Sequence, residues 1–276
     1  MANEALLPSL FAAHYVDIRG ADAPTEITAQ LRGTGLVTMN GLQSREAVVD
    51  AASALLHIVP HRDSEPDGLT VVRDTGRHSG LSGFAGLSNV ALAAHTEGSG
   101  ISMPPRLMML VCATPAAAGG ECMLVDGQAI YDDLLEREPT AVEALSDERA
   151  GLFGGQSGVL GPVFQHHQPD RVALRLRLDD LVRWHPLAQR FVPALVDSIA
   201  RNSQGFDLAR GNAYLIDNHR WLHGRTAFAG NRLLYRVLGN PRVSMSKGFP
   251  ISARGRLPLV SEPTGRRTSL AFRRVQ

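Results

Sequence analysis

Apolar and polar positions follow two patterns along the chain. Near the start, apolar residues recur at helical spacing over 25–32 and 44–56, with a short β-prone run at 36–39 between them. Strand-like runs follow. They lie at 69–73, 89–94, 106–112, 121–125, 161–165, 172–178, 213–217 and 232–238. The patterns predict a mixed α and β layer followed by a mainly β part.

Two helices are predicted to interrupt these strands, one over 126–137 and a longer amphipathic one over 186–203. Glycine pairs at 119–120 and 154–155 mark turns, and no repeat with a period of 20 to 50 residues is present. Many short strands with few crossover helices are typical of an antiparallel jelly roll. The predicted fold class is therefore α+β, mainly β, with a jelly-roll core and flanking helices.

The length and composition fit a single globular domain. The chain has 276 residues, of which 44% are hydrophobic and 20% charged, so a packed core is expected. We predict one domain over 1–276, with a jelly-roll core over about 69–240. The tail over 241–276 is rich in Arg, Pro, Ser and Gly, which predicts either a loop-like segment packed over the surface or a partly mobile lid.

The charge balance points to a small-molecule partner. The 28 basic and 27 acidic side chains nearly cancel, so no global field attracts nucleic acid or an anionic membrane. Lys247 is the only lysine, which argues against a Schiff-base mechanism. The two cysteines, the absence of a basic start and the absence of a long apolar run predict a soluble cytoplasmic protein. A homo-oligomer is left open.

The first candidate for chemistry is the pair His95 and Glu97. On extended backbone, residues two apart point to the same face, so both side chains can reach one ion. Two histidines and a carboxylate form the facial set that is diagnostic of non-haem iron(II) oxygenases. A hydrogen-bonded His and Glu at a strand end is nevertheless the commoner meaning of so short a pattern. A third ligand is needed.

The segment 213–226 contains two candidates for that ligand. Spacing alone cannot choose between His219 and His223, which share one face of a strand. The segment contains Asp217-Asn218-x-Arg220-x-x-His223-x-Arg225-Thr226, and upstream stands His95-Thr96-Glu97. Together these motifs resemble the 2-oxoglutarate-dependent oxygenases of the taurine dioxygenase and clavaminate synthase group. The resemblance implies a double-stranded β-helix in which His95, Glu97 and His223 bind iron(II) and are the catalytic centre.

The resemblance also implies a 2-oxoglutarate site. Over 232–238 the chain alternates like a strand, with Arg232 and Arg236 on one face, where two inward guanidinium groups need anionic partners. In the family this strand binds the distal carboxylate of 2-oxoglutarate, and either arginine could make the main contact. Family members add a threonine hydroxyl from a Gly-Gly-x-Thr strand. This chain has Cys122 at that place, and its thiol is only a weak donor.

The activity implied by the resemblance is oxidation of an unactivated C–H bond, most often hydroxylation. Dioxygen and 2-oxoglutarate are consumed as co-substrates, and succinate and CO2 are released. The presence of Glu97 argues against halogenation and is typical of members that oxidise amino acids or intermediates of natural-product and antibiotic biosynthesis. The same iron chemistry can desaturate, cyclise or epoxidise. Residues 77–91 and 98–103 are expected to line the substrate mouth, and Arg77, His78, Arg225 and Arg242 are weaker substrate candidates.

Two other function classes remain open at this point. A zinc hydrolase also uses two histidines and a glutamate, but the chain lacks a helical His-Glu-x-x-His motif and an obvious general base. A metal-free jelly-roll binding module, in which Glu97 merely bonds to the histidines, is the non-catalytic alternative.

Overall fold

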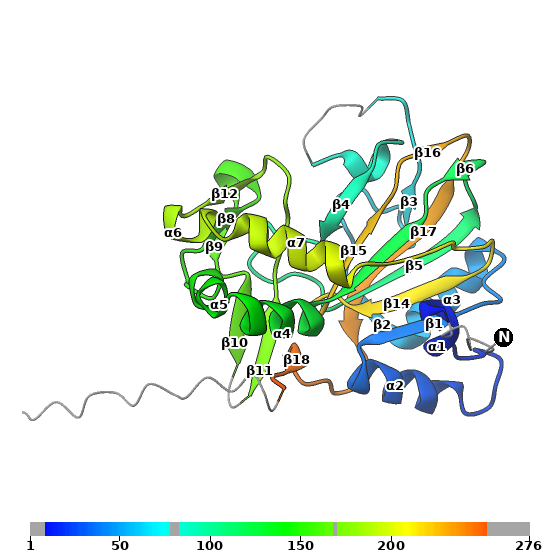
Figure 1. The fold of residues 1–276 in the computed structure, drawn as a ribbon. Helices are drawn as coiled ribbons and strands as arrows, with labels where there is room; N and C mark the ends of the chain where they lie inside the picture. Colours follow the sequence, from blue (N-terminus) through cyan, green and yellow to red (C-terminus); the bar gives the residue numbers. More distant parts are fainter. Residues whose placement is uncertain (1–8, 78–82, 168–169, 253–276) are drawn as a thin grey trace, which may run out of the picture.

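The fold is seen in a computed structural model, which describes residues 9–77, 83–167 and 170–252 (Figure 1). Its centre is a six-stranded antiparallel sheet in the order β1-β14-β5-β17-β2, with β3 also paired to β17. These strands are β1 (Leu36–Met39), β14 (Ala213–Asp217), β5 (Leu107–Thr114), β17 (Leu233–Pro241), β2 (Leu56–Ile58) and β3 (Thr70–Val72). The early β-prone run thus joins the main sheet.

A second antiparallel sheet has the strand order β13-β7-β15-β4. Its strands are β13 (Gln204–Phe206), β7 (Cys122–Asp126), β15 (Trp221–Arg225) and β4 (Leu92–His95). Side chains from both sheets form one buried cluster, which includes Leu110 and Tyr214 of the first sheet and Leu124 of the second. Two antiparallel sheets around a shared core make a jelly roll, as the strand pattern predicts.

Helices cover the outer face of each sheet (Figure 1). The main sheet packs against α2 (Ala23–Gly33) and α3 (Arg45–Leu55) through residues such as Ile27 and Val48. The second sheet packs against α4 (Gly127–Arg137), α5 (Pro139–Leu145) and α7 (Val192–Asn202). The alternation of each strand therefore sends one set of side chains to the helices and the other set to the space between the sheets.

The remaining elements are short. Three small sheets have the orders β12-β8-β9, β10-β11-β18 and β16-β6. Their strands are β12 (Val182–Trp184), β8 (Gly151–Phe153), β9 (Val159–Gly161), β10 (Phe164–His167), β11 (Arg171–Leu174), β18 (Phe249–Pro250), β16 (Phe228–Ala229) and β6 (Ala118–Gly119). The short helices are α1 (Leu10–Ala13), α6 (Pro186–Gln189), η1 (Ala85–Leu87) and η2 (Gly155–Ser157).

Two predicted elements need correction, and one helix was missed. The helix expected over 186–203 is divided into α6 and α7. In an unbroken helix the ring of Pro193 would clash with the carbonyl of Gln189, and Pro193 instead lies in the first turn of α7. The strand expected over 172–178 ends at Leu174, where the chain turns away and the Arg175 side chain binds carbonyls of Ser99 and Ile101. Helix α5 was not predicted at all.

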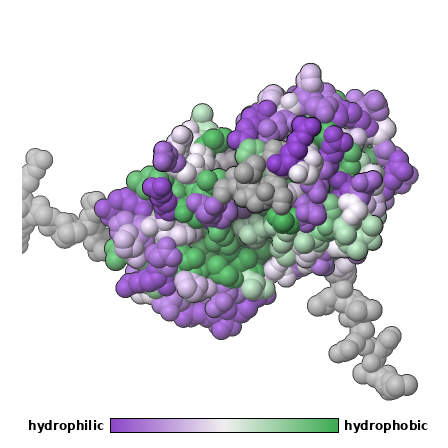
Figure 2. Space-filling model, turned by 90° about the horizontal axis from the view of Figure 1, so that it is seen from above, coloured by the Kyte–Doolittle hydropathy of each residue, from purple (hydrophilic) through white to green (hydrophobic). Residues whose placement is uncertain are grey.

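The surface seen from above is mostly hydrophilic, with an apolar area in its middle (Figure 2). Among the residues that the structure describes, no helix is both long and apolar enough to cross a membrane.

Candidate active site

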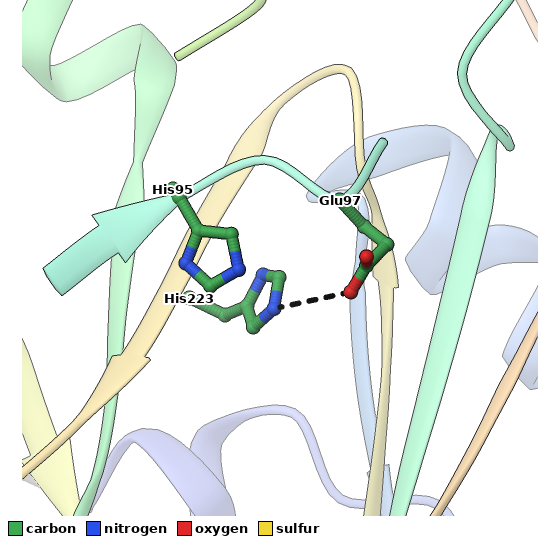
Figure 3. A group of neighbouring side chains, drawn as sticks. All are labelled: His95, Glu97 and His223. Atoms are coloured by element: carbon green, nitrogen blue, oxygen red, sulfur yellow. Dashed lines mark ion pairs between the residues drawn. The ribbon is translucent and has the colours of Figure 1, made fainter. Parts of the chain in front are cut away.

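Strand pairing brings the two predicted histidine ligands together. His95 is the last residue of β4, and the register of β4 and β15 places it opposite His223. Their ring centroids lie 4.2 Å apart (Figure 3). On β15, Leu222 packs toward the helices while the next side chain points between the sheets. The alternation of one strand therefore aims His223 at the end of β4.

Glu97 completes the group from the loop that follows β4 (Figure 3). Its Oε2 lies 3.9 Å from His223 Nε2, which is too far for a hydrogen bond. One ligand atom from each of His95, Glu97 and His223 lies within 4.8 Å of the others. In the described ranges, no other set of three or more His, Cys, Asp and Glu side chains meets this spacing. The three ligand atoms are therefore close enough together to share one metal ion.

The protonation states of the three side chains favour metal binding. Burial raises the pKa of Glu97, but Arg236, His223 and His95 outweigh this effect and lower the pKa to about 2. Burial lowers the pKa of both His95 and His223. At neutral pH the group is therefore one carboxylate and two neutral imidazoles, the forms that ligate a metal. The buried Nδ1 of His223 has no hydrogen-bond partner in the described part of the chain. The donor set fits iron(II), and it also fits zinc.

Asn218 fixes the backbone of Glu97. This asparagine follows β14 and is fully buried. Its Oδ1 accepts a hydrogen bond from the Glu97 N–H at 2.7 Å, and its Nδ2 donates to the Glu97 and Pro105 carbonyls, both at 2.9 Å. One side chain therefore satisfies both backbone polar groups of Glu97. The sequence motif contained Asn218, but its role follows only from the fold.

We expect Asn218→Ala to weaken iron(II) binding by roughly 10- to 100-fold, because groups that orient metal ligands typically have effects of this size. Equilibrium dialysis of anaerobic protein against iron(II) measures the change. Asn202→Ala is the matched control, since Asn202 also donates a hydrogen bond to a carbonyl, that of Ser198, but on α7. Equal iron affinity in the Asn218 and Asn202 variants would contradict the role of Asn218.

Two ion pairs support the same motif. Arg106 donates to both oxygens of the buried Asp217 at 2.7 and 2.8 Å. Arg220 donates to both oxygens of Asp126, at 2.9 and 2.7 Å, and so ties the start of β15 to the start of α4. These motif charges hold the strands that carry the ligands.

The two predicted arginines have different neighbours. Arg236 Nη1 lies 2.7 Å from Glu97 Oε2, so this arginine is paired with one of the predicted metal ligands. Arg232 Nη2 lies 3.8 Å from Cys122 Sγ and 3.3 Å from the Gly120 carbonyl. Arg232 is buried, and no carboxylate pairs with it among the described residues. The thiol of Cys122 is buried too, which raises its pKa to about 11.

One cavity of about 530 Å³ contains all six predicted site residues. Its inner part lies between the sheets, where the buried Leu110, Tyr214 and Leu234 surround Arg232 and Cys122. Its outer part includes residues 83–87 and 98–101, which fall within the ranges expected at the mouth. The mouth also contains His61, Arg177 and Asp179, which carried no sequence motif.

The weaker substrate candidates have other surroundings. Arg225 is buried at the cavity wall, where it donates to the carbonyls of Ala85, Ser88 and Val90. Arg242 donates to the carbonyls of residues 53 and 56, outside the cavity. His78 lies outside the described residues, and Arg77 does not line the cavity.

His219, the alternative third ligand, is not part of the ligand group. Its pKa is lowered to about 4, chiefly because the ring is buried.

Comparisons with known proteins identify the family of the chain. Residues 4–238 match the family described as Taurine catabolism dioxygenase TauD, TfdA family. Mitochondrial trimethyllysine dioxygenase of Gallus gallus is 27% identical over 173 residues, which cover 55% of this chain and 41% of the relative. The Homo sapiens protein of the same name is 27% identical over 175 residues, with the same two coverages. The matched region is therefore less than half of these relatives' length.

Solved structures share the fold. The non-heme iron oxygenase OrfP, in complex with Fe, succinate and (3S)-hydroxy-L-Arg, matches with a TM-score of 0.65 at 15% identity, covering 80% of this chain and 82% of OrfP. Asparagine oxygenase, in complex with Fe(II), 2S,3S-3-hydroxyasparagine and succinate, matches with a TM-score of 0.63 at 16% identity, covering 80% and 79%. The jelly-roll prediction is confirmed.

Proposed function

This chain belongs to the taurine catabolism dioxygenase TauD, TfdA family, and on this premise we propose that it is an iron(II)- and 2-oxoglutarate-dependent oxygenase of a small amino acid or a related biosynthetic intermediate. The observation that carries the proposal is the content of one cavity. Two imidazoles and a carboxylate meet there within 4.8 Å, and two arginines line the same cavity. A binding module has no need of this combination.

His95, Glu97 and His223 are proposed to hold the iron, which when bound activates dioxygen with electrons from 2-oxoglutarate. The protein's own part is positioning and exclusion of water. Strands β4 and β15 fix the two imidazoles, Asn218 fixes the Glu97 backbone, and the guanidinium of Arg236 keeps the carboxylate ionised.

Arg232 is the better candidate for the distal carboxylate of 2-oxoglutarate. A buried guanidinium without an anion is costly, and a carboxylate matches its planar donors. Arg236 already has a carboxylate partner in Glu97. The sequence did not distinguish the two arginines. We propose that Arg236 pairs with the metal ligand Glu97 and that Arg232, at the inner end of the cavity, binds the distal carboxylate of 2-oxoglutarate.

Replacing Cys122 with threonine is expected to strengthen 2-oxoglutarate binding by about 2- to 10-fold, since a hydroxyl forms a hydrogen bond that a thiol makes only weakly. Titration of the anaerobic iron complex with 2-oxoglutarate measures this affinity. Cys122→Val, which keeps the shape without a donor, is the control. Equal affinities in the threonine and valine variants would remove Cys122 from the co-substrate site.

The substrate class rests on size and likeness. A cavity of about 530 Å³ is of the size that holds small molecules. The OrfP and asparagine oxygenase structures contain hydroxylated amino acids, and the curated relatives are named for trimethyllysine. We propose hydroxylation of an amino acid or of an intermediate of natural-product biosynthesis. A product that has lost two hydrogens instead of gaining one oxygen would indicate desaturation or cyclisation.

The test of the proposed function is release of succinate from 2-oxoglutarate by purified protein. We expect release to require both iron(II) and dioxygen and to stop when zinc replaces iron. Hydrolytic activity with zinc, together with no succinate under any condition, would favour the zinc hydrolase.

A further inference from the structure

An ion pair at the cavity mouth has no role in the chemistry described so far. Arg177 and Asp179 line the cavity between β11 and β12. Arg177 Nε and Nη2 each lie 2.6 Å from an oxygen of Asp179. The Arg177 side chain is 16% exposed and that of Asp179 is 40% exposed. The pair is therefore held in one geometry while its open side remains accessible.

The backbone fixes this pair beside the metal ligands. Leu176 N–H donates to Thr96 Oγ1 at 3.0 Å, and Thr96 N–H donates to the Leu176 carbonyl at 2.9 Å. Thr96 stands between His95 and Glu97, and its partner Leu176 directly precedes Arg177. The pairing of Thr96 with Leu176 therefore holds Arg177 close to the metal ligands.

The surroundings of the pair are largely apolar. Phe84, Ile101 and Leu181 line the same cavity. A Cβ added to Gly83 would come within 2.8 Å of the Leu181 side chain and 4.0 Å of Arg177 Nη2. The backbone at Gly83 therefore lies close to the ion pair. The cavity thus combines the Arg177–Asp179 pair with apolar side chains, which suits a molecule with a charged head and an alkyl body.

The charges of Arg177 and Asp179 determine which kind of charged group the pair can bind. An unpaired arginine would favour an anion, but Asp179 cancels the charge of Arg177. Arg177 Nη1 makes no hydrogen bond within the described residues, and the half-exposed carboxylate of Asp179 has lone pairs left to accept one. The pair therefore offers a donor and an acceptor side by side, a pattern that complements a molecule with both charges.

We propose that Arg177 and Asp179 bind the charged head of a zwitterionic substrate, a free α-amino acid, with its carboxylate on Arg177 and its ammonium on Asp179. This inference rests on the proposed function and assigns two residues that set specificity. Another ion pair that lines the cavity, Arg62 and Asp63, is less suited, since its atoms lie 3.5 Å apart and the Arg62 side chain is 63% exposed.

A matched pair elsewhere in the chain provides the control. Arg149 and Asp147 have the same spacing in the sequence and also form an ion pair, at 3.2 Å, but their side chains are 65% and 45% exposed and lie outside the cavity. Arg149→Met and Asp147→Asn therefore repeat the chemical changes of Arg177→Met and Asp179→Asn away from the mouth.

The experiment uses the anaerobic complex of the full chain with iron(II) and 2-oxoglutarate, whose visible charge-transfer band reports occupancy of the metal site. The twenty free L-amino acids are added one by one. Each that shifts the band is then compared with its N-acetyl and C-amide derivatives. We expect at least one free amino acid to bind and each derivative to bind at least about tenfold more weakly, since each loses a charge-assisted contact.

The variants assign the contacts. In Arg177→Met the preference for the free acid over the C-amide should disappear, and in Asp179→Asn the preference for the free amine over the N-acetyl form should disappear. The variants at 147 and 149 should keep both preferences. Retention of both preferences in the 177 and 179 variants would overturn the proposal, as would a normal band that no amino acid shifts. Absence of the band itself would instead remove the proposed function on which the inference rests.

Discussion

Replacing His223 with alanine is expected to reduce iron-dependent succinate formation by more than about 100-fold. Loss of a group that only orients a ligand typically has a 10- to 100-fold effect, and loss of the ligand itself should exceed it. His223 lies opposite His95 in the strand register, so no other side chain in the described ranges can take its place in the group. Iron content and succinate release measure the result.

His219→Ala is the matched control for this prediction. His219 is the same residue type, lies four positions earlier and has a largely buried ring, but it is outside the ligand group. Its removal should leave iron binding within about threefold of the unaltered chain, since surface and packing changes seldom alter a site they do not touch. Loss of iron in the His219 variant, with iron retained in the His223 variant, would mean that the third ligand is wrongly assigned.

Replacing Arg232 with alanine is expected to weaken 2-oxoglutarate binding by roughly 10- to 100-fold, because hydrogen bonds to a charged group contribute about 1.5–3 kcal/mol. Iron affinity should change little, since Arg232 contacts Cys122 and Gly120 rather than a ligand. Arg232→Lys keeps the charge but cannot form two parallel hydrogen bonds to a carboxylate. Its affinity for 2-oxoglutarate should therefore lie between those of the unaltered chain and Arg232→Ala. Titrations with 2-oxoglutarate at fixed iron(II) give these values.

Arg236→Ala separates the two arginines. Removing its guanidinium leaves Glu97 without its 2.7 Å partner, so the pKa of Glu97 should rise toward its usual value. The main effect is expected on the pH range in which iron binds, with retention lost at a higher pH on acidification. A larger loss of 2-oxoglutarate affinity in this variant than in Arg232→Ala would reverse the proposed division of roles.

Local patterns were enough to predict the elements with strong periodicity. The strand expected over 213–217 matches β14, and the helix expected over 126–137 matches α4 within one residue, where Asp126 caps the first turn. The helix over 186–203 was wrong because apolar periodicity outweighed the single residue, Pro193, that divides it. The boundaries of the domain and of its core remain predictions.

The site residues also fall into those that the sequence could predict and those that only the fold reveals. His95, Glu97 and His223 carried a motif, but the distinction between Arg232 and Arg236 depends on contacts with Cys122 and Glu97, which are 110 and 139 residues away in the chain. Arg177 is held at the cavity by the pairing of Thr96 with Leu176, 80 residues apart. No spacing in the sequence encodes such contacts.

The most direct test of the central claim is an anaerobic titration of the purified protein with iron(II) and 2-oxoglutarate, followed by visible absorption. We predict a weak charge-transfer band that saturates at one equivalent of iron and is absent in His95→Ala and His223→Ala. A protein that binds iron weakly and gives no band, or a band that survives in both variants, would contradict the assignment of this site.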